Sequence, residues 1–131
     1  MIRLEDRPEG EADWTKAAEL TLRLTSRAFS VPIDRLIARS RSERQVAYAR
    51  QAAMYLMHVT FGGTYQDTGR ALGRERTTVA YACSLIEDDR DDAPFDGKLT
   101  ELEEALKRLW YVERLRGVRA PRARGADRAA A

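Results

Sequence analysis

The run Arg74-Glu75-Arg76-Thr77-Thr78 concentrates side chains that can hydrogen-bond to flat polar edges and to anions. An arginine can donate two parallel bonds to a guanine, a glutamate can accept from a cytosine amine, and a threonine can contact a base or a phosphate. Arginines at the start of a helix lie where the helix dipole disfavours cations, and an anionic partner would relieve this. The pattern favours DNA contact over its alternative, a charged corner of a helical hairpin.

Two short helices joined by a tight turn are predicted to position this run. Thr64 and Asp67 form a capping box that opens the first helix, which continues through Ala71. Gly73 has the position typical of a helix C-terminus, and a second helix is predicted from about 75 to 89. This spacing is that of a helix-turn-helix, in which the start of the second helix faces base edges in the major groove.

The remaining chain is also predicted to be helical, because apolar residues recur at three- and four-residue steps and convincing strand alternation is absent. Pro32 is expected in the first turn of a short helix, and a capping box of Ser42 with Gln45 is expected to open the third. The predicted elements are a helix over 13–28 with Asp13 as its N-cap, a short helix that buries Ile33, Leu36 and Ile37, a helix from Ser42 to about Val59, a loop over 91–97, and an amphipathic helix over 99–115.

The chain of 131 residues is long enough for one domain with a modest core. We therefore predict a small all-α domain over 12–115, with the helix-turn-helix at its centre. Residues 1–11 are polar and are predicted to form a flexible leader. Residues 116–131 are rich in Arg and Ala and are predicted to form a disordered tail.

Several classes of function are disfavoured by composition. One cysteine, Cys83, and one histidine, His58, cannot form a Cys/His zinc site or an internal disulfide, and Cys83 is expected to be buried. We find no catalytic constellation and no phosphate-binding Gly-x-x-x-x-Gly-Lys loop, so we predict no enzyme, no cofactor and no small-molecule substrate. No apolar run approaches the length of a membrane span. The expected location is the cytoplasm, in association with the nucleoid.

Charge is unevenly distributed, although the net charge is only +2. Residues 39–76 hold seven arginines against three acids, whereas residues 87–104 hold nine acids against two bases. A protein polarised in this way can present a basic face to phosphates. Ordinary solvated faces are the alternative explanation.

Two stretches resemble a known family. Residues 44–56 read RQVAYARQAAMYL, and the family pattern is Arg-x-Val-Ala-x-x-Arg-Gln-x-Ala-Met-x-Leu. Residues 73–79 read GRERTTV, against Gly-Gly-Arg-Asp-His-Thr-Thr-Val in the family, and Ala82-Cys83 follows in register. The chain thus resembles, over roughly residues 13–112, the C-terminal DNA-binding domain of the bacterial replication initiator DnaA, a fold related to the Trp repressor.

The resemblance implies a role for each matching residue. Base contacts fall on the five residues Arg74, Glu75, Arg76, Thr77 and Thr78. Contacts to the DNA backbone fall on Arg50 and Gln51 by the resemblance, and Thr64 and Arg70 are further candidates for such contacts. The connector before the third helix supplies candidates for the minor groove, which are Arg41 first, then Arg39 and Arg44. The tail, with Arg119, Arg122 and Arg124, is expected to add nonspecific affinity through counterion release.

Two departures from the family pattern point to a different target. Glu75-Arg76 replaces an Asp-His pair, and Arg76 is expected to prefer a guanine. One glycine of the family's turn is missing, which would change the angle of the recognition helix. The nine-base-pair box of the initiator is therefore not the predicted site.

Three functions remain open at this stage. The first is a bacterial transcription regulator that binds double-stranded DNA, such as an activator of a gene transfer agent cluster, because stand-alone relatives of this domain include such regulators. The second is a modulator of replication initiation that competes for initiator boxes. The third is an adaptor that docks RNA polymerase or another transcription factor through the acidic segment 87–104 or through Trp110-Tyr111, unless Trp110 belongs to the core.

Overall fold

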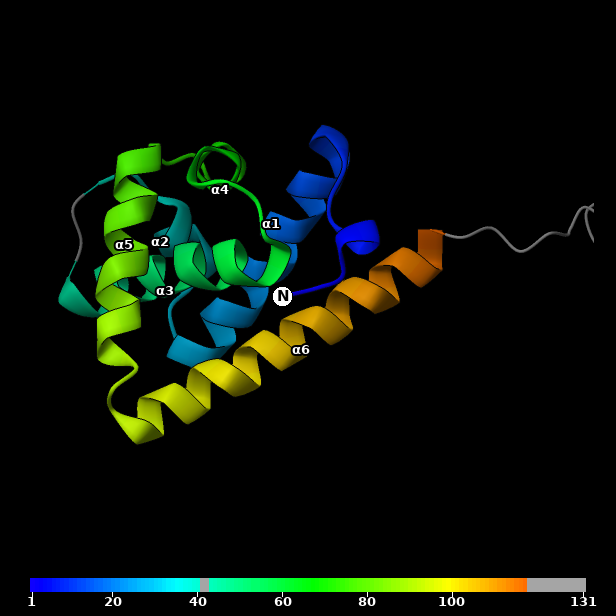
Figure 1. Cartoon of the computed structure of the whole chain (residues 1–131). Helices are drawn as coiled ribbons and strands as arrows, with labels where there is room; N and C mark the ends of the chain where they lie inside the picture. Colours follow the sequence, from blue (N-terminus) through cyan, green and yellow to red (C-terminus); the bar gives the residue numbers. More distant parts are fainter. Residues whose placement is uncertain (41–42, 118–131) are drawn as a thin grey trace, which may run out of the picture.

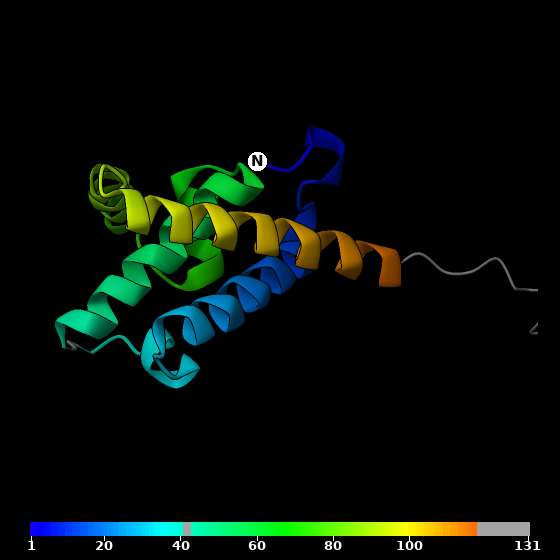
Figure 2. The same ribbon diagram turned by 90° about the horizontal axis from the view of Figure 1, so that it is seen from below.

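A computed structural model describes residues 1–40 and 43–117, and every described element is helical (Figure 1). The central helix α3 packs against the other five α-helices, and α6 runs along one side of the molecule (Figure 2). The elements are a 3-10 turn η1 (Leu4–Asp6) and the helices α1 (Gly10–Phe29), α2 (Ile33–Ile37), α3 (Arg44–Phe61), α4 (Tyr65–Leu72), α5 (Arg76–Asp89) and α6 (Ala93–Gly117).

The main core forms where α1, α3, α5 and α6 converge. Leu56 and Met57 of α3, Ile86 of α5 and Leu106 of α6 are all fully buried there. Trp110 is also buried and stacks edge-on against Phe61, so it belongs to the core and not to an exposed docking surface. A small second cluster joins α2 to α3 through Val31, Leu36, Val46 and Ala49.

The predicted flexible leader is packed against the domain, and that prediction is wrong. Ile2 is buried, and its N–H donates to the Thr60 carbonyl at 3.0 Å. The indole N–H of Trp110 donates to the Asp6 carbonyl at 2.6 Å. Because these partners are about 60 and 100 residues away, no local pattern in residues 1–11 could indicate them.

Helix α1 begins at Gly10, three residues before the predicted start. Asp13 is therefore not the N-cap. It lies in the first turn, where its Oδ2 accepts the N–H of Glu9 at 2.9 Å. An acidic side chain in this position favours the positive end of the helix dipole.

The predicted loop over 91–97 is wrong, because α6 begins at Ala93 and contains most of it. Pro94 is tolerated in the first turn, since an N–H there would have no partner within the helix. The Oδ2 of Asp92 accepts the N–H of Phe95 at 3.0 Å and so stabilises the start. The acidic residues that suggested a loop are suitable for a helix N-terminus. Helix α6 then continues to Gly117, two residues past the predicted end of the domain.

The shorter elements depart less from prediction. In α2 only Leu36 is buried, whereas Ile33 and Ile37 are 39% and 52% exposed. Helix α3 continues past Val59 to Phe61 and ends where Gly62 has a φ of 74°. The predicted N-cap Ser42 lies outside the described residues, as does the predicted tail from residue 118 onward.

Candidate nucleic-acid interface

The start of the helix-turn-helix is set by the predicted capping box. The Oγ1 of Thr64 accepts the N–H of Asp67 at 2.9 Å, and the Oδ2 of Asp67 accepts the N–H of Thr64 at 3.0 Å. Helix α4 ends at Gly73, whose φ of 72° is a left-handed conformation that favours glycine. The predicted capping box and the predicted C-terminal glycine are both confirmed. Both features were predictable because they depend on residues close together in the sequence.

The turn between α4 and α5 is tight because of Gly69. Its carbonyl accepts the N–H of Arg74 at 2.7 Å. A Cβ atom at Gly69 would overlap with the Arg74 carbonyl oxygen, which belongs to the backbone and cannot move aside. Glycine at this position lets the two helices approach closely enough to form a compact unit.

One side of α5 is anchored in the core. Val79, Ala82, Cys83 and Ile86 are buried, which confirms the predicted burial of Cys83. Burial raises the pKa of the Cys83 thiol to about 11, so it is held as the neutral thiol. The opposite side of α5 is consequently fixed in its direction toward solvent.

The first turn of α5 presents four of the predicted base-contacting residues to solvent: Glu75, Arg76, Thr77 and Thr78 are all exposed. Glu75 is the N-cap residue, and its side chain makes no capping bond. None of the ion pairs among residues 1–40 and 43–117 involves Glu75 or Arg76. This turn therefore offers a cation, hydroxyls and helix N-terminal amides to an external partner.

Sequence reasoning missed Tyr81. Its side chain is 63% exposed, and it lies one turn beyond Thr77 on the same side of α5. Ser84 continues this exposed row. The signal was available, because steps of four and three from Thr77 reach Tyr81 and Ser84.

Arg74, the fifth predicted base contact, is partly buried and bonds within the protein. Its Nη2 donates to the carbonyl oxygens of Leu36 at 2.8 Å and of Ala38 at 3.0 Å. Burial lowers the pKa of Arg74, and the charges of Arg50 and Arg39 lower it further. The side chain of Arg74 thus bonds to residues that lie 36 and 38 positions earlier in the chain, and its base contact stays a prediction.

Arg50, predicted to contact the DNA backbone, is engaged in a similar way. Its Nε and Nη2 donate to the Arg35 carbonyl at 3.1 and 2.6 Å, and its Nη1 donates to the Ser40 carbonyl at 3.0 Å. The adjacent Gln51 is half-buried. All of the hydrogen bonds found for the Arg50 guanidinium are therefore made to α2 and to the connector that follows it.

The other predicted contacts do not share one end of the molecule, because Arg44 is the first residue of α3 and Thr64 follows the last one. Arg39 is exposed, and its Nη2 lies 3.8 Å from the point where a Cβ of Gly73 would be, so the connector passes close to the turn. Thr64 and Arg70 on α4 and Arg44 on α3 are exposed. The predicted contacts outside the described residues are Arg41, Arg119, Arg122 and Arg124.

The far end of α5 has the opposite electrostatic character. Glu87, Asp88 and Asp89 end the helix, and all three are exposed. Arg90 follows, with its side chain 16% exposed and ion pairs of 2.5 Å to Asp96 and to Glu103. The acidic end of α5 faces α6, whereas the basic end lies beside α4 (Figure 1).

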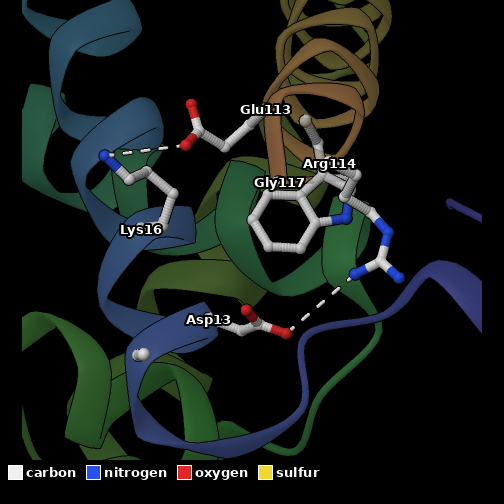
Figure 3. A pocket seen from close by; sticks show the side chains of 7 residues that line it. Asp13, Lys16, Glu113, Arg114 and Gly117 are labelled. Atoms are coloured by element: carbon white, nitrogen blue, oxygen red, sulfur yellow. Dashed lines mark ion pairs between the residues drawn. The ribbon is translucent and has the colours of Figure 1, made fainter. Parts of the chain in front are cut away.

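A hollow of about 390 Å³ lies between α1 and α6, with Trp110 against it (Figure 3). Its charged groups pair with one another, since Lys16 lies 3.9 Å from Glu113 and Arg114 lies 4.0 Å from Asp13. The charged groups that line the hollow therefore have partners on the facing helix, and we assign no ligand to it. No helix in the described part of the chain is long and apolar enough to cross a membrane.

Comparison with known proteins finds a family whose match includes the helix-turn-helix and the helices that precede it. The family model described as the helix-turn-helix of bacterial DnaA protein matches residues 18–86, from α1 to the end of the buried face of α5. The match therefore includes both the connector and the recognition turn.

Curated relatives align over the same region. The chromosomal replication initiator protein DnaA of Chloroflexus aurantiacus is 34% identical over 95 residues, covering 71% of this chain and 20% of that protein. The protein of the same name from Lachnoclostridium phytofermentans is 30% identical over 90 residues, with 67% and 20% covered. DnaA 2 of Chlamydia trachomatis is 37% identical over 71 residues, with 54% and 15% covered. The aligned region spans about a fifth of the length of the first two relatives.

Proposed function

Because the chain belongs to the bacterial DnaA helix-turn-helix family, we propose that it binds double-stranded DNA and reads sequence with the start of α5. The observation that carries this proposal is the first turn of α5. No hydrogen bond or ion pair to its exposed Arg76, Thr77 and Thr78 side chains is found among residues 1–40 and 43–117, and the other side of the helix is anchored in the core. A rigid helix with free polar groups at its N-terminus suits insertion into a major groove.

Sequence discrimination is assigned to Arg76 with Thr77 and Thr78. Arg76 can donate two bonds to a guanine, and a good contact of this kind is worth about 1–3 kcal/mol against the wrong base. Tyr81 lies one turn further along and can donate its hydroxyl to a phosphate or a base. Glu75, exposed beside them, can accept from a cytosine amine.

Affinity is assigned to the basic residues around this turn. Arg70 in the last turn of α4 and Arg39 in the connector are the exposed arginines near it, and both can contact phosphates. Thr64 and Arg44 are also exposed but lie at opposite ends of α3, so they would contact phosphates further from the turn. Gln51 adds a polar contact at the edge of this surface. Each phosphate that such residues neutralise releases counterions, which makes binding weaken as salt rises.

We further propose that the protein regulates transcription. The DnaA relatives are about five times longer than the region they share with this chain, so their role as initiators does not by itself transfer. Glu75-Arg76 supports a separate target, because charge and hydrogen-bonding groups at the base-reading turn determine which site is preferred. RNA polymerase or another transcription factor would be the protein partner of such a regulator.

A second candidate is competition with an initiator for its boxes. The identity of 30–34% with chromosomal replication initiators over most of this chain favours it. The two candidates predict different preferred sites, and this makes them separable in one experiment.

The test is selection of binding sites from a random duplex library with the purified full chain. We expect one enriched motif, and a motif unlike the initiator box would support the regulator. Enrichment of the initiator box would support the competitor. Arg76→Ala should lose preference at one base pair, whereas Arg108→Ala, an exposed change on α6, should leave the motif intact. Failure to enrich any motif, with no binding even at low salt, would overturn the proposed function.

A further inference from the structure

Helix α2 is held to the domain by little apolar surface. It has five residues, and of its three large apolar side chains only Leu36 is buried. A helix this short also leaves its last carbonyl groups without partners inside the helix. Contacts from other elements must therefore hold α2 and the start of the connector, residues 38–40, which includes Arg39.

Two guanidinium groups, one on α3 and one in the turn between α4 and α5, provide this support. Arg50 on α3 binds the carbonyls of Arg35 and Ser40, with distances of 2.6–3.1 Å. Arg74 binds the carbonyls of Leu36 and Ala38 at 2.8 and 3.0 Å. Together they bind four carbonyl groups within six consecutive residues.

Arg74 also belongs to the turn of the helix-turn-helix. Its backbone N–H bonds to the Gly69 carbonyl at 2.7 Å, so its main chain is fixed to α4 while its side chain reaches the connector. Arg39 on that connector lies beside Gly73. The position of Arg39 relative to the start of α5 is thus set by Arg74 from one side and by Arg50 from the other.

We propose that Arg50 and Arg74 are positioning residues, which hold the connector so that Arg39 and the first turn of α5 meet the same DNA duplex together. This inference rests on the proposed function and deepens it. The guanidiniums of Arg39, Arg50 and Arg74 lie close enough for their charges to interact, and none takes part in the ion pairs found within residues 1–40 and 43–117. Bound phosphate would compensate this local charge. Of these three arginines, only Arg39 needs to contact the DNA directly.

The decisive test is a double-mutant cycle measured by binding to the selected duplex at one fixed salt concentration. Arg39→Ala, Arg74→Ala and the double variant are compared with the wild type. If Arg74 acts through the connector, the double variant should bind within about twofold of the weaker single variant, because the second change removes an interaction already lost. If both residues contact DNA independently, their fold-losses should multiply, and this result would overturn the proposal for Arg74.

Arg50 is tested by charge-preserving substitution. Its three bonding nitrogens form a fork that a lysine cannot reproduce, although lysine keeps the charge and remains a good phosphate ligand. A positioning role predicts that Arg50→Lys binds nearly as weakly as Arg50→Ala. Binding close to that of the wild type in Arg50→Lys would show a simple charge contact and overturn the proposal for Arg50.

Amide hydrogen exchange on the protein without DNA separates this inference from the proposed function. Arg50→Ala and Arg74→Ala should speed exchange at the backbone N–H groups of α2, where those of Arg35 and Leu36 bond to the Pro32 carbonyl, while amides in the middle of α3 stay protected. Arg76→Ala is the control and should leave exchange in α2 unchanged. Unchanged exchange in both variants would refute the positioning role even if the wild type binds DNA. Conversely, faster exchange in a chain that binds no DNA would leave the structural role standing and remove the proposed function.

Discussion

Helix α5 has an arginine at each end, and the two have opposite surroundings. Arg90, directly after the last turn, is largely buried and bonds to Asp96, Glu103, Thr100 and the hydroxyl of Tyr55. Arg76, in the first turn, is exposed and has no ion-pair partner among the described residues. An arginine thus stabilises the fold at one end of α5, and another arginine is available to an external anion at the other end. Residue type alone does not separate these two uses.

The connector arginines lie between these extremes. Arg50 and Arg74 are engaged, as Arg90 is, but with neutral carbonyl groups and not with carboxylates. Their charges therefore remain uncompensated within the described chain. This arrangement fixes local geometry and at the same time keeps the surface basic, which suits a site that must be both preformed and attractive to phosphate.

The largest effect on stability is expected at Arg90. Arg90→Ala leaves Asp96 and Glu103 without their partner, and hydrogen bonds to charged groups are worth about 1.5–3 kcal/mol. We expect the free energy of unfolding, measured by urea denaturation, to fall by about 2–3 kcal/mol. Arg108→Ala is the control and should change it by less than about 0.5 kcal/mol. An equally small change for Arg90→Ala would erase the contrast between the two ends of α5.

Arg76 is expected to show the reverse behaviour. Arg76→Ala should change the free energy of unfolding by less than about 0.5 kcal/mol, because the side chain is exposed. It should reduce discrimination at one base pair by about 1–3 kcal/mol, or roughly 5- to 150-fold. Competition binding with duplexes that differ at single positions measures this loss. An equal loss of affinity on every duplex would instead make Arg76 a phosphate contact.

Removing residues 118–131 tests a third group of arginines, which includes Arg119, Arg122 and Arg124. If these contact phosphates, the slope of log affinity against log salt should fall by about 2–3, at about 0.9 for each contact. The preferred site should stay the same. Titrations at several salt concentrations measure the slope, and a shifted site preference would mean that this segment reads bases.

The smallest effect is expected at the middle of α5. Because burial raises the pKa of Cys83 to about 11, only about one thiol in a thousand should be ionised at pH 8, against roughly a quarter for an ordinary thiol. Reactivity should increase as the pH approaches this raised value. Alkylation at pH 8, followed by mass spectrometry, should be slow in the folded protein and fast in urea. Rapid alkylation of the folded chain would show that α5 is not anchored as described.

Predictions from sequence succeeded where the relevant bonds are local. The capping box of Thr64 with Asp67 closes within three residues, and Gly73 ends α4 through its own backbone conformation. The buried face of α5 follows from helical periodicity. These features, together with the family motifs, located the helix-turn-helix and its exposed first turn. The extension of that surface to Tyr81 was missed, although the same periodicity contained it.

Only the tertiary structure decided where the long side chains and the terminal segments go. Arg74 and Arg50 bond to carbonyl partners between 10 and 38 residues away, and Ile2 bonds to Thr60, which is further still along the chain. The start of α6 is stabilised by the bond from Arg90 to Asp96 and by the bond that the Asp92 carboxylate accepts from the N–H of Phe95. A local pattern indicates which groups a segment offers. The partners of those groups depend on packing among helices that are remote in the sequence. An arginine that finds a partner within the protein acts in the fold, whereas one that finds none is available for binding.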